Sequence, residues 1–184
     1  MEKEEPVLQK PDLMLVERAC NGGADSFTEL CRRYYPAMVA IAHSILGDRH
    51  LAEDAAQQTF ANAVSKLPQL KNKNKFAAWL AVICRNVALD FAQRTETHRT
   101  ADDLSMIAAK PDENGPTEPV REALSRLSAS AREVIFLRYY DGMTYEQISA
   151  VLGISEQAIS GRLRRAKKKM ANYLRRNGFG KVLL

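Results

Sequence analysis

Residues 144–170 read TYEQISAVLGISEQAISGRLRRAKKKM and have the spacing of a helix-turn-helix. Thr144 can cap a first helix, and Gly153 supplies a tight turn in which a left-handed backbone conformation is expected. Ser155 can cap a second helix, whose apolar residues recur at steps of four, three and four residues. The inward-facing residues predicted for this segment are Ile148, Val151, Leu152, Ile154, Ile159, Leu163, Ala166 and Met170.

The outward face of the predicted second helix is small and polar at its N-terminal end and strongly basic further along. Small and amide side chains can approach base edges in the major groove, and cations can neutralise phosphates. The alternative is a solvated charged helix of a bundle, but such faces usually mix both signs of charge to gain pairs one turn apart. We therefore predict a DNA recognition helix with these contact residues: Ser155, Glu156, Gln157, Ser160, Gly161, Arg162, Arg164, Arg165 and Lys168.

The positive charge of the chain is concentrated in this C-terminal region. The formal net charge of the 184 residues is +5, and the segment from Arg162 to Lys181 holds nine cations and no acid. The rest of the chain is therefore slightly acidic. Such asymmetry indicates a local site for a polyanion rather than a generally adhesive surface.

The sequence offers no pattern typical of a metal site, a cofactor site or a catalytic centre. The three cysteines lie far apart without a CxxC pair, and the three histidines have no carboxylate motif beside them. We expect reduced thiols in helices, no cofactor and no enzyme activity. The N-terminus lacks the zones of a signal peptide, and the longest apolar run, residues 77–84, is too short to cross a bilayer. A cytoplasmic protein without membrane insertion is expected.

Upstream of residue 144 the apolar residues also recur at helical steps, and strand patterns are nearly absent. We expect helices over residues 13–20, 25–46, 48–67 and 76–94. Asp25 or Ser26 is the expected cap of the second of these, Pro36 should kink it and Gly47 should end it, while Asp48 should cap the third.

A change of composition divides the chain. Residues 98–119 contain three prolines, one glycine and five acids, which predicts a flexible acidic linker. Helical periodicity resumes beyond it, with helices expected at about 120–127, 129–140, 144–151 and 156–175. The predicted fold is all-α, with two small helical domains over residues 1–97 and 120–184.

Three segments resemble one family. Residues 144–170 with their continuation look like the region 4 helix-turn-helix of bacterial extracytoplasmic-function (ECF) sigma factors of the sigma-70 superfamily. Residues 27–67, FTELCRRYYPAMVAIAHSILGDRHLAEDAAQQTFANAVSKL, resemble regions 2.1–2.2, and residues 76–94, FAAWLAVICRNVALDFAQR, resemble regions 2.3–2.4. The resemblance implies a subunit that binds core RNA polymerase, recognises a −35 promoter element through its second domain, and melts and captures a −10 element through its first.

The predicted helix 76–94 carries a polar face that suits the −10 role. Asn86 and Asp90 are four residues apart, so they project together, and an amide and a carboxylate can read the edge of an unpaired base. In the family, the loop that precedes this helix pockets an extruded −10 base, which implies a similar role for residues 67–75; a solvated linker is the alternative. The predicted single-strand contacts are Lys71, Asn72, Lys73, Asn74, Lys75, Arg85, Asn86, Asp90, Gln93 and Arg94. Trp79 is expected to pack in the core rather than stack on a base.

The resemblance also implies protein partners. The second long helix would meet the β′ clamp helices of core polymerase through Glu53, Asp54, Gln57, Gln58 and Phe60, and an acidic patch on a DNA-binding domain is consistent with a protein partner there. The second domain would meet the β flap, and an anti-sigma factor is an expected partner. Two positions depart from the usual pattern: Gln58 stands where the family usually has Glu, and Gly161 lies inside the recognition helix.

Three other classes of protein fit the sequence less well. A conventional helix-turn-helix regulator would need a dimer surface or a sensor domain, and residues 1–99 resemble neither. A sigma mimic that only occupies an anti-sigma factor would not need the cation run or the polar face at Asn86 and Asp90. An enzyme would need a paired catalytic motif around His43, His50 or His98, and the sequence shows none.

Overall fold

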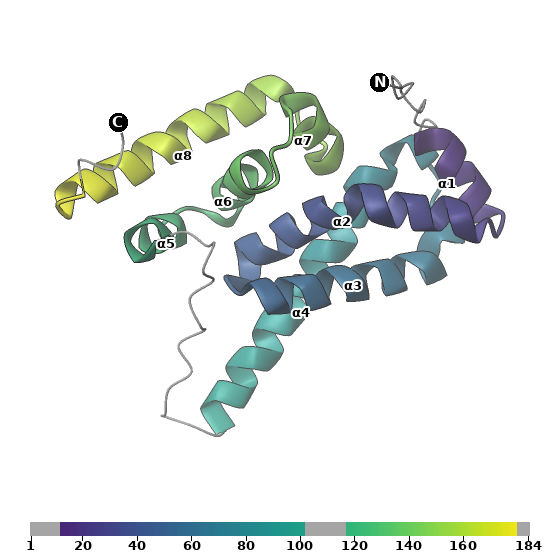
Figure 1. Cartoon of the computed structure of the whole chain (residues 1–184), viewed down its shortest axis with the longest axis horizontal. Coiled ribbons are helices and arrows are strands. Elements are labelled where there is room, and N and C mark those ends of the chain that lie inside the picture. Colours follow the sequence, from purple (N-terminus) through teal and green to yellow (C-terminus); the bar gives the residue numbers. More distant parts are fainter. Residues whose placement is uncertain (1–11, 102–116, 180–184) are drawn as a thin grey trace, which may run out of the picture.

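The structure is a computed structural model that describes residues 12–101 and 117–179, and within these ranges its regular elements are all helical (Figure 1). The first domain consists of α1 (Asp12–Cys20), α2 (Ala24–Leu46), α3 (Arg49–Lys66), two short turns of 3-10 helix, η1 (Leu67–Gln69) and η2 (Lys73–Lys75), and α4 (Phe76–Ala101). The second consists of α5 (Glu118–Ser125), α6 (Ala129–Ile135), the π-helical turn η3 (Phe136–Tyr140), α7 (Tyr145–Leu152) and α8 (Glu156–Arg176). The all-α prediction is confirmed.

Most predicted helix ends agree with the structure, and the start of α2 does not. Asp48 caps α3 by accepting a hydrogen bond from the Leu51 amide, and Gly47 ends α2 with φ of 70°. The cap of α2 is Gly23, not Asp25 or Ser26. A Cβ at position 23 would lie 2.8 Å from the Arg18 carbonyl oxygen, so the close approach of α1 selects glycine there.

The predicted linker, residues 98–119, overlaps helices at both ends. α4 continues to Ala101, and α5 already begins at Glu118, with Pro119 in its first turn where a missing amide proton costs nothing. The remaining linker acids, Asp102, Asp103, Asp112 and Glu113, lie outside the described residues, as does the weak turn considered around residues 104–108. Pro36 lies inside α2, which stays one helix on both sides of it.

Helix α4 is the central element of the first domain. Its buried face includes Phe76, Leu80, Cys84 and Val87, and it packs against α2 and α3. The α3 side of this core is built from alanines, which allow the helices to approach closely: Ala52, Ala55, Ala56 and Ala63 are all fully buried. Trp79 is half-buried with its ring 5.9 Å from that of Phe76, in agreement with the expected core packing.

One segment of the described residues, 73–95, is long and apolar enough to cross a membrane by length and composition alone. It consists of η2 and most of α4. In the structure this helix is amphipathic, with one face inside the bundle and the other carrying Asn86, Asp90 and Gln93. A core helix of a bundle passes the same length test, so the segment is explained by its packing.

The cores of the two domains are continuous. Helix α7 packs against α4, and α6 and η3 pack against α2. Figure 1 shows the green and yellow second domain lying alongside the helices of the first. The buried residues of both domains form a single cluster that includes Met38 and Leu80 on one side and Leu137 and Ile148 on the other.

Candidate nucleic-acid interface

The predicted helix-turn-helix is formed by α7 and α8. The Thr144 side chain accepts a hydrogen bond from the Gln147 amide, and the Gln147 side chain accepts one from the Thr144 amide, which makes a complete capping box. Gly153 has φ of 67°, the left-handed conformation that the turn requires. Ser155 then caps α8 by accepting from the Ala158 amide. These local predictions are confirmed.

Packing decides which face of α8 is free. Ile159, Leu163 and Ala166 are buried, Met170 is half-buried, and Leu174 extends the buried stripe by one more turn. Among the predicted DNA contacts, two are only half-buried, Gly161 and Arg162. The exposed ones are Ser155, Glu156, Gln157, Ser160, Arg164, Arg165 and Lys168.

A hollow of about 250 Å³ lies beside the basic half of α8. It is formed where the turn between α5 and α6 meets α8, and its lining includes Ser128, Ser130, Arg162, Arg165 and Lys169. Hydroxyl groups and cations in one concavity suit a phosphate group of a DNA backbone. Arg162 is half-buried because its side chain lines this basic hollow and does not lie on the outermost surface of the helix.

The predicted −10 face is exposed on α4. Asn86, Asp90, Gln93 and Arg94 are all exposed, on a helix whose opposite side is fixed in the core. This leaves an amide and a carboxylate one helical turn apart and open to a ligand.

The segment before α4 is more regular than the sequence indicated. It contains η1 and η2, and the Asn72 side chain accepts a hydrogen bond from the Asn74 amide, capping η2. Lys73 is half-buried, while Lys71, Asn74 and Lys75 are exposed. Three lysines thus lie immediately before the α4 face, and one of the two asparagines is already used in holding the backbone.

Arg85 has a partner that the sequence did not reveal. Its Nε donates to Oε1 of Glu133 on α6 at 2.8 Å, and the two side chains are 30% and 11% exposed. The prediction that Arg85 holds a DNA strand therefore meets a competing contact in this structure. The residues are 48 positions apart, and no periodicity or spacing rule pairs them.

The predicted polymerase surface on α3 is largely exposed, with one exception. Asp54, Gln57 and Gln58 are exposed, and Glu53 is half-buried with a salt bridge to Arg49 at 3.0 Å. Phe60 is only 8% exposed because its ring stacks on Tyr35, 6.4 Å between centroids. Its prediction as a surface contact is corrected: Phe60 belongs to the core that holds α3 against α2.

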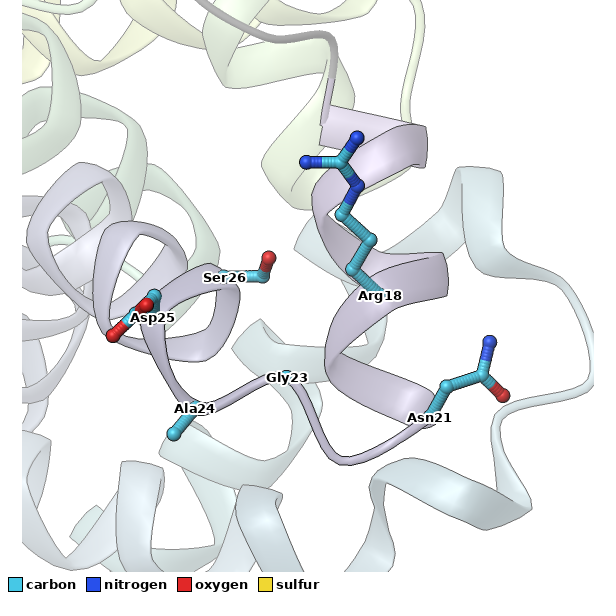
Figure 2. Close-up of a pocket in the computed structure, with 6 residues that line it drawn as sticks. All are labelled: Arg18, Asn21, Gly23, Ala24, Asp25 and Ser26. Atoms are coloured by element: carbon cyan, nitrogen blue, oxygen red, sulfur yellow. The ribbon is translucent and has the colours of Figure 1, made fainter.

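The hollow at the turn between α1 and α2 is not a binding site of this kind. It measures about 470 Å³ and is lined by polar side chains, but Figure 2 shows that Arg18, Asn21 and Asp25 point away from one another. Among the side chains that the structure describes, in residues 12–95 and 117–179, there is no group of three or more metal-ligating residues.

Two family models match the two domains. The Sigma-70 region 2 model matches residues 30–97, and the Sigma-70, region 4 model matches residues 117–170. The RNA polymerase sigma factor CarQ of Myxococcus xanthus is 30% identical over 166 residues, with 86% of this chain and 95% of CarQ covered. The chain belongs to the ECF-type sigma factors of the sigma-70 family.

Solved sigma-factor structures agree with this assignment. CnrH, which is known from Cupriavidus metallidurans and was solved in complex with the cytosolic domain of CnrY, aligns with a TM-score of 0.61 at 28% identity, covering 91% of this chain and 99% of CnrH. RpoE of Bartonella quintana, solved with the anti-sigma factor NepR, aligns with a TM-score of 0.56 at 27% identity, covering 83% and 98%. The chain spans only 37% and 64% of the length of two other curated sigma factors that it matches. Sigma factors are transcription initiation factors and not enzymes.

Proposed function

We propose that this protein binds core RNA polymerase, recognises a −35 element through α8 and a −10 element through α4, and promotes melting of the −10 duplex. The observation that carries the proposal is that one chain exposes two separate polar helix faces, on α8 and α4, each held rigidly from behind by a buried stripe. A conventional regulator with a single helix-turn-helix would not need the exposed polar face on α4.

At the −35 element the two halves of α8 have different roles, one contacting bases and the other phosphates. Gln157 and Ser160 lie on the N-terminal half, where short side chains reach base edges, and Arg165 and Lys168 lie on the half that meets phosphates. The hollow lined by Arg162 and Arg165 adds a second place for a phosphate on the side of α5 and α6.

At the −10 element the exposed face of α4 captures an unpaired base. Asn86 and Asp90 supply donors and acceptors for the base edge, and Lys71 and Lys75 lie before the same helix to hold the strand. Extruding a base costs a few kcal/mol, which these contacts offset. Since they form only after the duplex opens, they favour the open complex over the closed one.

Protein partners follow from the remaining exposed surface. We infer that Asp54, Gln57 and Gln58 on α3 contact the β′ clamp helices and that the second domain contacts the β flap. CnrH was solved with the cytosolic domain of CnrY, and RpoE with the anti-sigma factor NepR, which supports an anti-sigma partner here as well. A protein that acts on the bacterial transcription machinery works in the cytoplasm, without membrane insertion.

The test is the combined replacement Asn86→Ala and Asp90→Ala, assayed with core polymerase on a linear promoter. Polymerase binding and −35 contact should be retained, while open-complex formation, measured by permanganate reactivity of −10 thymines, should fall at least about tenfold. On a template with a pre-melted mismatched bubble the double variant should recover only part of its activity, since base capture is still missing.

The chain offers a control with the same residue types at the same spacing in Asn21→Ala with Asp25→Ala, both exposed where α1 meets α2 and neither on the α4 face. This control should melt the promoter normally. Full activity of the Asn86/Asp90 variant on duplex DNA would contradict the −10 assignment. Tight sequence-specific binding by the protein without polymerase would favour an ordinary regulator instead.

A further inference from the structure

Helix α8 is longer than recognition of the −35 element requires. It runs without a break from Glu156 to Arg176, and its 21 residues measure about 31 Å. The major groove that such a helix enters is only about 12 Å wide. The last DNA contact assigned above is Lys168, so two further turns of helix, residues 169–176, follow the part that lies in the groove.

The exposed face that carries the basic −35 contacts continues along these two turns. Steps of three and four residues lead from Arg165 and Lys168 to Asn172, Arg175 and Arg176, which places all five on one side of the helix. All five are exposed, and Asn172 accepts a hydrogen bond from Nη2 of Arg175 at 3.1 Å. We call Arg175 and Arg176 the distal pair.

Contacts with α5 fix the direction of the last two turns of α8. Leu174 is only 2% exposed, and the Arg126 guanidinium of α5 lies 4.6 Å over the centre of the Tyr173 ring. Lys169 donates a hydrogen bond from Nζ to the Arg126 carbonyl oxygen. Figure 1 shows α8 as one continuous helix that passes α5 near its C-terminal end. The distal pair is therefore held in a fixed position relative to the −35 contacts.

The position of the distal pair at a helix end does not by itself explain this pattern. Arginines in the last turn interact favourably with the free carbonyl groups there. That effect requires neither a common face with the −35 contacts nor an absence of acids. A solvated helix face usually gains pairs of opposite charge one turn apart, whereas residues 171–180 contain no acid. A continuous basic face on a rigid helix suits a continuous polyanion.

We propose that the distal pair binds the phosphate backbone of the duplex directly upstream of the −35 element; this rests on the −35 recognition by α8 proposed above. Arg175 lies seven residues after Lys168, about 10 Å along the helix. The minor groove that separates two phosphate backbones is about 6 Å wide. With Lys168 on the backbone at the edge of the major groove, the distal pair reaches the backbone across the adjoining minor groove.

The direction of α8 supports the upstream side. Figure 1 shows the distal end of α8 directed away from the first domain, which carries the −10 face. The duplex on the other side of the −35 element is the spacer that leads toward that domain. A guanidinium fits a phosphate through its planar fork of donors, and contacts to phosphates carry no sequence information. The contact therefore adds affinity and orients α8 without selecting a base sequence.

The salt dependence of promoter binding tests the contact. In the variant Arg175→Gln with Arg176→Gln the charges are lost, while glutamine forms helix about as well as arginine. Affinity of the holoenzyme is measured on a long duplex, which extends about two helical turns upstream of the −35 element, and on a short duplex that ends at the element. On the long duplex, the slope of log affinity against log salt should be less steep by up to about 1.8, or about 0.9 per lost phosphate contact.

This change of slope corresponds to a clear difference in affinity. Between about 50 mM and 200 mM salt, the parent protein should lose about tenfold more affinity for the long duplex than the variant does. On the short duplex the two proteins should have the same affinity and the same slope, because the phosphates that the distal pair binds are missing. Equal affinity there also shows that the variant is folded and engages the −35 element.

The matched control is Arg32→Gln with Arg121→Gln, which removes the same two charges from surface salt bridges outside α8 and should keep the parent slope on both duplexes. Equal slopes for the parent and the distal variant on the long duplex would overturn the upstream contact. A difference that persists on the short duplex would also overturn it, because the pair would then contact the −35 element or the polymerase. Failure of the parent holoenzyme to bind either duplex would instead remove the −35 recognition on which the contact rests.

Discussion

Gly161 is an unexpected residue for the interior of the recognition helix. Its backbone is ordinary helix, so no turn requires glycine, and a glycine inside a helix costs about 1 kcal/mol relative to alanine. The space above it is occupied by Arg165: a Cβ at position 161 would lie 3.3 Å from Nη1 of that side chain. The absent methyl group lets the Arg165 guanidinium lie close to the helix backbone.

The replacement Gly161→Ala should therefore separate stability from DNA binding. The free energy of unfolding, measured by chemical denaturation, should rise by about 1 kcal/mol because alanine loses less backbone freedom on folding. Affinity of the holoenzyme for a −35 duplex should fall, since the methyl group displaces Arg165 by a few tenths of an ångström and narrows the approach. Higher stability with unchanged −35 affinity would leave Gly161 without a role in DNA binding.

At the scale of elements, the segment between α6 and α7 connects the interdomain interface to the helix-turn-helix. Helix α6 passes directly into the π-helical turn η3, and Gly142 with φ of 70° then redirects the chain toward Thr144. Asp141 lies half-buried between these features, and burial raises the pKa of its carboxyl group to about 6. A charge at this position is therefore unfavourable for the fold.

The sign of the pH dependence follows from this shift. Between about pH 4 and pH 6 the folded protein holds the Asp141 proton more tightly than the unfolded chain, so its contribution to stability is lost as pH rises through that window. Asp141→Asn should remove this loss. The variant should match the parent protein near pH 4 and exceed it by about 1 kcal/mol at pH 7.5, a value reduced by residual contact with water. Denaturation curves at both pH values measure the difference, and an equal difference at pH 4 and pH 7.5 would contradict a titration at Asp141.

At the scale of the whole molecule, we expect the interface to make the two domains one cooperative unit. A single buried cluster runs through both, and Phe136 lies in it at 7% exposure, against His43 of the first domain. Domains that share a core unfold together, whereas domains joined only by a linker unfold separately.

Calorimetry tests this coupling. The parent protein should give one unfolding transition, and Phe136→Ala should divide it into two, with the second domain unfolding at the lower temperature. The replacement removes the ring from the interface and leaves a cavity that costs about 3 kcal/mol or more. One transition that only moves to lower temperature would show that this ring does not couple the domains.

Local sequence determined the elements and much of the candidate site. Thr144, Gly153 and Ser155 act within three or four residues of their own positions, so capping rules and the need for a left-handed turn predicted them correctly. The periodicity of α4 and α8 separated buried from exposed faces for the same reason, because a helix that packs on one side repeats every 3.6 residues. Asn86 and Asp90, with the basic residues of α8, could thus be assigned to exposed helix faces from the sequence alone.

Tertiary packing decided what depends on distant residues. Gly23 caps α2 because α1 approaches it, Phe60 is buried because Tyr35 stacks on its ring, and Arg85 is engaged because Glu133 lies opposite. Each contact joins different helices, and the docking of the second domain on α2 and α4 does the same on a larger scale. A sequence pattern records only which face of its own helix a residue occupies. The packing of the whole chain decides which other helix contacts that face. These features could therefore be found only in the three-dimensional structure.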